Sequence, residues 1–236
     1  MKSLAIVPAR GGSKRLPYKN IRPINEKPLV EYTIEAVIKS QCFQKLIFSS
    51  EDENILSIGK KYSAMIDIDI EKREPHLATD TSTVLELVCE ISSRPILSNQ
   101  FDVIVLLLPT CPFREAKDIQ EGFRLLSKKV DGVVSLTNFE FPPQLSLNIN
   151  EKGLIDPVFS PSPLITGQTR SQDQKTIYRP NGGFYMQWWK SFEKNQNFFK
   201  GTVMGYVMPR FSSVDIDDEI DLKYAQFLID NNIINC

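Results

Sequence analysis

The run from Val103 to Leu108, within DVIVLLLPT, most constrains the fold of this 236-residue chain. Every position in it is apolar, so it lacks the alternation of a strand that faces water on one side. A strand buried on both faces is typical of a parallel sheet covered by helices. We therefore expect helices on both sides of this strand.

Strand-like and helix-like segments alternate around this run. Apolar stretches at 3–9, 45–50 and 131–137 indicate strands, and periodic stretches at 28–40, 50–62, 118–129 and 217–232 indicate helices. This alternation predicts an α/β fold with a mostly parallel, doubly wound sheet and helices on both faces. Ligands bind such sheets beyond the carboxyl ends of the strands.

Local signals refine these helices. Ser50-x-x-Glu53 and Thr83-x-x-Glu86 are capping-box patterns and predict two helix starts. The C-terminal helix is expected to bury one face. The residues expected on it are Ile220, Tyr224, Phe227 and Leu228.

The segment 138–179 breaks the alternation, because it is rich in proline, serine and other polar residues. Loops of this length inside a compact domain are uncommon unless they bind a ligand or form an interface. We interpret the chain as a single domain, 1–236, in which 138–179 is an inserted subdomain that covers the active site or pairs with a partner subunit.

Composition argues against several functional classes. The net charge of −1 disfavours nucleic-acid binding, which is typical of basic domains. The four cysteines lack metal-site spacing and favour a reducing compartment. The chain shows neither a signal-peptide core at its start nor an apolar stretch long enough to span a membrane. We expect a cytoplasmic protein that binds no membrane.

The stretch PARGGSKRLPYKN follows the first strand and concentrates positive charge. Arg10, Lys14, Arg15 and Lys19 surround a glycine pair, which allows backbone amides to approach an anion. Four charges match a nucleoside triphosphate better than a single carboxylate. The P-loop and dinucleotide-binding fingerprints are both absent.

A second constellation lies in SSVDIDDE near the end of the chain. Asp215 and Asp217 are two residues apart, so on an extended segment both carboxylates point the same way. They can share a hard cation such as Mg²⁺. Helix capping by Asp217 or Asp218 is the alternative. Magnesium is the better reading beside a polyphosphate loop.

Five motifs occur in the order typical of one enzyme family: PARGGSKRLPYKNI, REPHLATDTST, LLPTCPFR, YRPNGGFY and SVDIDDEIDL. Together they resemble the CMP-sialic acid synthetases (acylneuraminate cytidylyltransferases), which include enzymes for legionaminic and pseudaminic acid. The resemblance implies a Rossmann-like α/β fold with a small inserted dimerisation subdomain. It further implies a homodimer that uses CTP, Mg²⁺ and a nonulosonic acid to form a CMP-sugar and pyrophosphate for cell-surface polysaccharide biosynthesis.

The resemblance also assigns residues by motif position. Catalytic roles fall to Arg10, Lys19, Asn181 and Asp217, and metal binding to Asp215 and Asp217. Nucleotide binding falls to Arg10, Gly11, Gly12, Ser13, Lys14, Arg15, Lys19, Asn20, Arg73, Ser82 and Thr83. Sugar binding falls to Leu108, Phe198 and Phe199, and we add Arg170 and Arg179 as candidate partners of the sugar carboxylate. For Phe198 and Phe199, core packing is the alternative.

The chain departs from the family pattern mainly near the sugar. Leu108 replaces the usual glutamine, Cys111 replaces a serine, and Gln144 stands where sialic-acid enzymes place a lysine. The sugar is therefore N-acetylneuraminic acid or a di-N-acylated relative such as legionaminic or pseudaminic acid. Two alternatives stay open: a 3-deoxy-manno-octulosonate cytidylyltransferase and a non-catalytic nucleotide-binding regulator.

Overall fold

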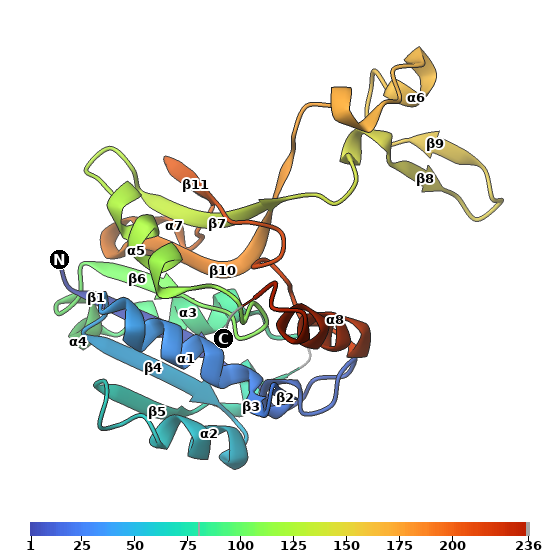
Figure 1. The fold of residues 1–236 in the computed structure, drawn as a ribbon. Helices are drawn as coiled ribbons and strands as arrows, with labels where there is room; N and C mark the ends of the chain where they lie inside the picture. The colour runs from blue at the N-terminus through green and yellow to red at the C-terminus, as the bar shows by residue number, and fades with distance from the viewer. Residues whose placement is uncertain (80, 235–236) are drawn as a thin grey trace. The chain divides into compact units, whose positions relative to one another are not determined.

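The computed structural model describes residues 1–79 and 81–234. Two compact units make up the chain (Figure 1). The larger unit consists of Met1–Leu136 together with Pro180–Cys236, and the smaller unit of Thr137–Arg179.

A seven-stranded sheet forms the centre of the larger unit, in the order β11-β7-β10-β6-β1-β4-β5. The strands are β1 (Ser3–Pro8), β4 (Lys45–Ser50), β5 (Ile68–Lys72), β6 (Val103–Leu106), β7 (Gly132–Asn138), β10 (Tyr178–Trp188) and β11 (Val203–Val207). β5, β4, β1 and β6 pair in parallel, as do β7 and β11, whereas β10 is antiparallel to β6. The predicted mostly parallel α/β sheet is confirmed.

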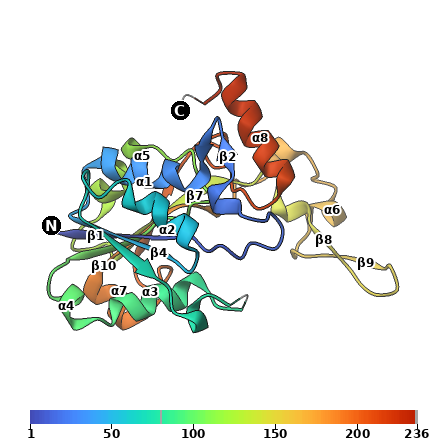
Figure 2. The same cartoon turned by 90° about the horizontal axis from the view of Figure 1, so that it is seen from below.

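Helices cover both faces of this sheet (Figure 2). One face is covered by α1 (Leu29–Ser40), α2 (Glu53–Lys60) and α5 (Ala116–Leu125). The other is covered by α3 (Val84–Ser92), α4 (Pro95–Ser98) and α7 (Trp189–Asn195). The last helix, α8 (Glu219–Asp230), packs in a third cluster with Leu16, Ile24 and Phe113.

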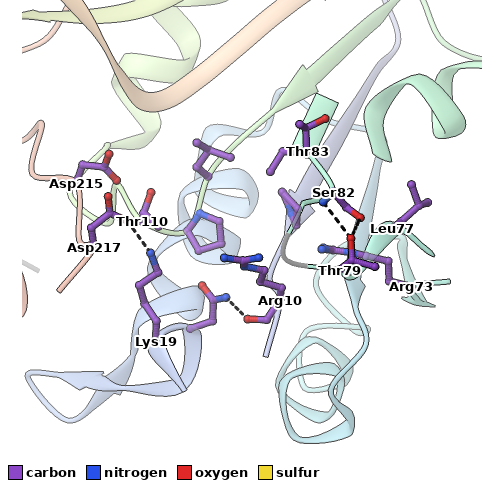
Figure 3. Close-up of a pocket in the computed structure, with 15 residues that line it drawn as sticks. Arg10, Lys19, Arg73, Leu77, Thr79, Ser82, Thr83, Thr110, Asp215 and Asp217 are labelled. Atoms are coloured by element: carbon purple, nitrogen blue, oxygen red, sulfur yellow. Dashed lines mark hydrogen bonds and ion pairs between the residues drawn. The ribbon is translucent and has the colours of Figure 1, made fainter. Parts of the chain in front are cut away.

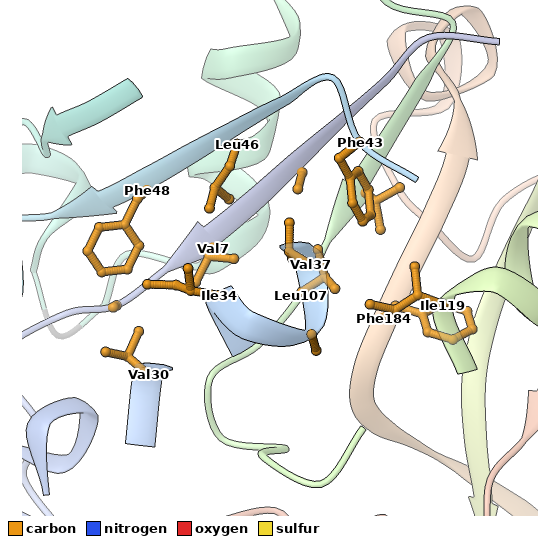
Figure 4. Close-up of a cluster of buried hydrophobic side chains, with 14 of the residues drawn as sticks. Val7, Val30, Ile34, Val37, Phe43, Leu46, Phe48, Leu107, Ile119 and Phe184 are labelled. Carbon is orange, nitrogen blue, oxygen red and sulfur yellow. The ribbon is translucent and has the colours of Figure 1, made fainter. Parts of the chain in front are cut away.

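The main core lies between the sheet and the first group of helices (Figure 4). Val7 and Phe48 from the sheet contact Val30, Ile34 and other apolar residues of α1, all fully buried. Burying one such side chain contributes about 1.5–3 kcal/mol. This packing holds the carboxyl ends of β1 and β4 in fixed positions.

One of the two capping-box predictions changes in the structure. The Thr83–Glu86 capping box is confirmed, since Thr83 accepts from Glu86 N–H and Glu86 from Thr83 N–H. The Ser50 start is wrong. Asp52 caps α2 instead, because its carboxylate accepts the N–H groups of Asn54 and Ile55.

The expected buried face of α8 is wrong for three of its four residues. Ile220, Tyr224 and Phe227 are exposed, and only Leu228 is buried. Leu222 and Ala225 complete the buried face instead. The amphipathic pattern of this helix is ambiguous because both faces carry large apolar residues.

The smaller unit contains a β8–β9 hairpin (Leu147–Ile149 and Ile155–Pro157) and the short helix α6 (Pro163–Thr166). Many of its apolar side chains are exposed to solvent within the chain. They include Phe141, Leu147, Ile149, Leu154, Ile155, Val158 and Ile165.

Candidate active site

A cavity of about 360 Å³ opens at the carboxyl edge of the sheet (Figure 3). Its walls come from the segments after β1 and β6, from 73–79 and 82–84, and from the segment before α8. The lining residues are Pro8, Arg10, Lys19, Asn20, Arg73, Leu77, Thr79, Ser82, Thr83, Val84, Leu108, Pro109, Thr110, Asp215 and Asp217. Parallel sheets bind their ligands at this edge.

One end of the cavity combines acids and bases. Asp215 and Asp217 lie together, with Lys19 pointing toward them (Figure 3). Lys19 Nζ lies 2.9 Å from Asp217 Oδ1, and Arg15 Nη2 lies 2.7 Å from Asp217 Oδ2. The cationic loop therefore contacts the aspartate pair directly.

This contact determines the charge state of Asp217. Partial burial raises the pKa of its carboxyl group, but hydrogen bonds and charges from Lys19 and Arg15 outweigh the burial. The net result is a pKa below the ordinary value. Asp217 is therefore an anion at neutral pH, as a metal ligand must be.

Arg73 lies at the opposite end of the cavity (Figure 3). It is buried, with Nη2 2.9 Å from Ser49 O and Nε 3.2 Å from Ser49 Oγ. Burial lowers the pKa of its guanidinium, the charge of Glu51 raises it, and Arg10 lowers it further. Arg73 is thus held as a rigid donor beside a second arginine.

Hydroxyl groups surround Arg73. Ser82 Oγ lies 2.6 Å from His76 O and 2.5 Å from Thr79 Oγ1. Thr83, the cap of α3, is the third hydroxyl there. Thr79 was missed by the sequence analysis, although the TDTST stretch signals a hydroxyl-rich turn.

Not all residues of the cationic loop face the cavity. Gly11, Gly12 and Ser13 line a neighbouring hollow with Glu51, and Lys14 is exposed. The N–H groups of Gly11 and Gly12 donate to Glu51 Oε1 at 2.7 and 3.2 Å. Their predicted nucleotide contacts stay a prediction.

Asn20 combines a structural contact with a place in the cavity wall. Its side-chain amide donates to Arg10 O at 2.7 Å, so it fixes the loop backbone from within the cavity.

Asn181 does not line the cavity. Its Oδ1 accepts from Ser135 Oγ and Gly183 N, and its Nδ2 lies 2.8 Å from Ser213 Oγ. The residue is buried and connects β7 and β10 to the segment that leads to Asp215. Its predicted catalytic role stays a prediction, beside a clear structural one.

The predicted sugar residues of the larger unit differ in exposure. Leu108 lines the cavity. Phe198 is buried against Phe192, with ring centroids 4.7 Å apart, which matches the core-packing alternative. Phe199 is exposed and meets Tyr185 edge-on at 5.9 Å.

Tyr185 is an additional candidate that the sequence analysis missed. Burial and, to a lesser extent, the charge of Asp215 raise the pKa of its phenol to about 12, and its ring meets Phe199, a predicted sugar residue. The final tyrosine of YRPNGGFY was the available signal.

Arg170 and Arg179 belong to the smaller unit. Arg179 Nη2 lies 3.3 Å from Glu140 Oε1 in that unit, and Arg170 is exposed at the start of the turn 171–173. Gln144 donates to Lys175 O there. Their roles at the sugar stay predictions.

Across 1–79 and 81–234, no group of three or more His, Cys, Asp and Glu side chains is arranged to hold a metal ion. In the same ranges, no helix is long and apolar enough to span a membrane.

Known proteins resemble the chain along most of its length. It is 31% identical to the CMP-N,N'-diacetyllegionaminic acid synthase of Legionella pneumophila, over 98% of both chains. It is also 31% identical to the N-acylneuraminate cytidylyltransferase of Escherichia coli O18:K1:H7, over 95% of this chain and 51% of that protein.

A solved structure supports the fold. The structure of CMP:2-keto-3-deoxy-manno-octonic acid synthetase complexed with CTP matches 98% of this chain and 100% of that chain, with a TM-score of 0.66 and 12% identity. The family model described as Cytidylyltransferase matches residues 4–179. By its sequence, this chain belongs to the cytidylyltransferase family and is a nucleotidyltransferase.

Proposed function

We propose that this chain transfers CMP from CTP to a nonulosonic acid and releases pyrophosphate. The observation that carries the proposal is the cavity in which Arg10, Lys19 and Arg73 face Asp215 and Asp217. The cations suit a triphosphate, and the aspartates suit the metal that accompanies it. The names of the relatives supply the sugar class.

The cavity suggests an orientation for the nucleotide. The nucleoside would lie at the end with Arg73, Ser82 and Thr83, whose fixed donors and hydroxyls suit polar recognition. The phosphates would lie along Arg10 and Lys19 toward the aspartates. Arg15 reaches the same end through its contact with Asp217.

The aspartate pair fits a magnesium ion by its donor chemistry. Asp215 and Asp217 both line the cavity and offer carboxylate oxygens, and Mg²⁺ completes its shell with phosphates and water. Asp217 is ionised, but Lys19 and Arg15 occupy both its oxygens. These two cations would turn to the phosphates. When bound, the ion would neutralise charge on the triphosphate.

Positioning and charge stabilisation are the chemistry that the residues support. The anomeric hydroxyl of the sugar would attack the α-phosphorus in line as pyrophosphate leaves. Arg10 and Lys19 would stabilise the charge that develops on the leaving group. This step requires no protein nucleophile, and Cys111 is fully buried.

The sugar is N-acetylneuraminic acid or a di-N-acylated relative such as legionaminic or pseudaminic acid. Leu108 gives the cavity an apolar wall, which suits a deoxygenated, acylated sugar. Relatives for both sugar classes are 31% identical to the chain, so identity favours neither. Arg170 or Arg179 would hold the sugar carboxylate.

We propose a cytoplasmic homodimer formed through the smaller unit. Its exposed apolar residues, among them Ile149 and Ile155 on the hairpin, make an apolar surface that monomers rarely leave uncovered.

Two alternatives have some support. A 3-deoxy-manno-octulosonate cytidylyltransferase shares the fold, but that likeness has 12% identity against 31% for the relatives above. A non-catalytic nucleotide-binding regulator would not need the aspartates. Both aspartates line the cavity, which argues against this alternative.

A panel assay tests the proposal. Pyrophosphate release is measured from CTP and Mg²⁺ with N-acetylneuraminic, legionaminic, pseudaminic and 3-deoxy-manno-octulosonic acids. Release with one of the first three supports the proposal and names the sugar. Release with the octulosonic acid alone supports the first alternative, and no release with any sugar supports the regulator.

A further inference from the structure

The turn after β4, residues 51–52, is hydrogen-bonded to the nucleotide loop. Glu51, in this turn, accepts the N–H groups of both Gly11 and Gly12 on a single oxygen, Oε1. Upstream, Ala9 N–H donates to Ser49 O at 2.9 Å. The loop that bears the cations is therefore hydrogen-bonded at three points: Ala9 to the end of β4, and Gly11 and Gly12 to the turn that follows it.

Close packing reinforces these bonds. A Cβ atom placed on Gly11 would come within 2.9 Å of both Cβ and Oδ2 of Asp52. Real Cβ atoms essentially never approach so closely, so only glycine fits here. Gly11 is thus explained by contact with the turn, without any phosphate.

The direction of the Gly11 and Gly12 amides supports the same conclusion. Gly11 and Gly12 line the hollow that contains Glu51, whereas Arg10 and Lys19 line the main cavity. A glycine-rich anion loop usually turns its amides to the ligand. Here the amides bind the carboxylate of Glu51. The side chains of Arg10 and Lys19 would therefore bind the ligand.

We propose that Glu51 is a positioning residue, which fixes the loop so that Arg10 and Lys19 face the triphosphate. Ser49, near the end of β4, holds Arg73, so the short segment 49–51 contacts both ends of the proposed nucleotide site. The identity of the ligand in this inference rests on the proposed function. The anchoring of the loop does not.

Two substitutions separate anchoring from charge. Glu51→Ala and Glu51→Gln remove the same negative charge, but only glutamine keeps an oxygen that accepts the two amides. We expect Glu51→Ala to raise KM for CTP by about tenfold or more, and Glu51→Gln to change it by less than about threefold. KM for the sugar should stay unchanged in both.

Glu53→Gln is the matched control, because Glu53 is exposed, pairs with Lys72 and carries the same charge two residues away. It should behave like the parent protein. Equal KM values for CTP in Glu51→Ala and Glu51→Gln would overturn the proposal. A tighter binding of CTP by Glu51→Ala would show instead that the amides serve the phosphates.

A measurement without ligand keeps the proposal independent of the activity. Hydrogen exchange at the amides of Gly11 and Gly12 should be faster in Glu51→Ala than in the parent or in Glu51→Gln. Unchanged exchange in a folded Glu51→Ala variant contradicts anchoring. Absence of turnover by the parent protein with any sugar would refute the proposed function, while the exchange result would still decide the role of Glu51.

Discussion

Lys19 Nζ lies 2.9 Å from Asp217 Oδ1, across 198 residues of sequence. The contact joins the first loop of the chain to the segment before its last helix. In the proposed function, Lys19 contacts the phosphates of the substrate and Asp217 binds the metal that accompanies them. In the structure the two side chains form an ion pair, so each charge is offset by the other.

This pairing makes an unusual prediction for Asp217→Asn. Turnover should fall at least about 100-fold, because the amide cannot replace a charged metal ligand. CTP binding in excess EDTA should stay equal or become tighter, because Lys19 and Arg15 are released to the phosphates. Steady-state rates with Mg²⁺ and equilibrium binding of CTP in EDTA measure the two effects.

Glu219→Gln serves as the control for Asp217→Asn. Glu219 is exposed and pairs with Arg22, so its loss changes the local charge equally without touching the cavity. Near-normal turnover of a folded Asp217→Asn protein would remove the metal assignment. Weaker CTP binding in EDTA would contradict the proposed release of the two cations.

Arg73→Lys tests the nucleoside end of the cavity. A lysine cannot reproduce the two bonds to Ser49 that fix the guanidinium, so we expect KM for CTP to rise about 10-fold or more. The neighbouring Lys72→Arg change is a matched control, since Lys72 is exposed and pairs with Glu53. Initial rates over a range of CTP concentrations measure both. Equal KM values for CTP in Arg73→Lys and the parent protein would exclude Arg73 from nucleotide binding.

Some parts of this architecture were predictable because they depend on local pattern. The apolar run at Val103 places β6 in the sheet centre, and the carboxyl-edge rule directs Arg10, which follows β1, to the edge where the cavity lies. The Thr83 capping box needs only residues three apart.

Other parts depend on tertiary contacts that no local pattern reveals. Gly11 of the glycine pair donates to Glu51, which lies 40 residues further along the chain. The glycine motif by itself indicates only a turn and not this partner. The strand β10 has glycines at its centre and was not predicted, yet it pairs with β6. In α8 the choice between Leu222 and Tyr224 for the core is made by Leu16 and Phe113 from distant segments.

Asn181→Ala separates a structural role from a catalytic one. The change leaves the buried Ser213 hydroxyl without its donor and Gly183 N–H without its acceptor, so unfolding free energy should fall by about 2 kcal/mol or more. Chemical denaturation measures this loss. Ser213→Ala removes one of the bonds and should cost less. A fully stable Asn181→Ala protein without turnover would favour direct catalysis.

The hairpin of the smaller unit allows a test of the proposed dimer. Ile149 and Ile155 are opposite each other across β8 and β9, and both are exposed. Replacing both by glutamate should shift sedimentation from dimer to monomer, because an interface cannot bury two unpaired charges. Replacing the exposed Glu151 and Lys152 at the hairpin turn by alanine is the control. A parent protein that sediments as a monomer would refute the dimer outright.

Leu108→Gln tests where sugar preference is set. Leu108 lines the cavity, and glutamine adds a donor and an acceptor where the parent offers only methyl groups. We expect the ratio of kcat/KM between N-acetylneuraminic acid and a di-N-acylated sugar to rise about tenfold, with KM for CTP unchanged. Leu77→Gln is the matched control, since Leu77 lines the same cavity beside Arg73 (Figure 3). It should raise KM for CTP and leave the sugar ratio unchanged. If Leu108→Gln alters CTP binding and leaves the sugar ratio constant, Leu108 belongs to the nucleotide site.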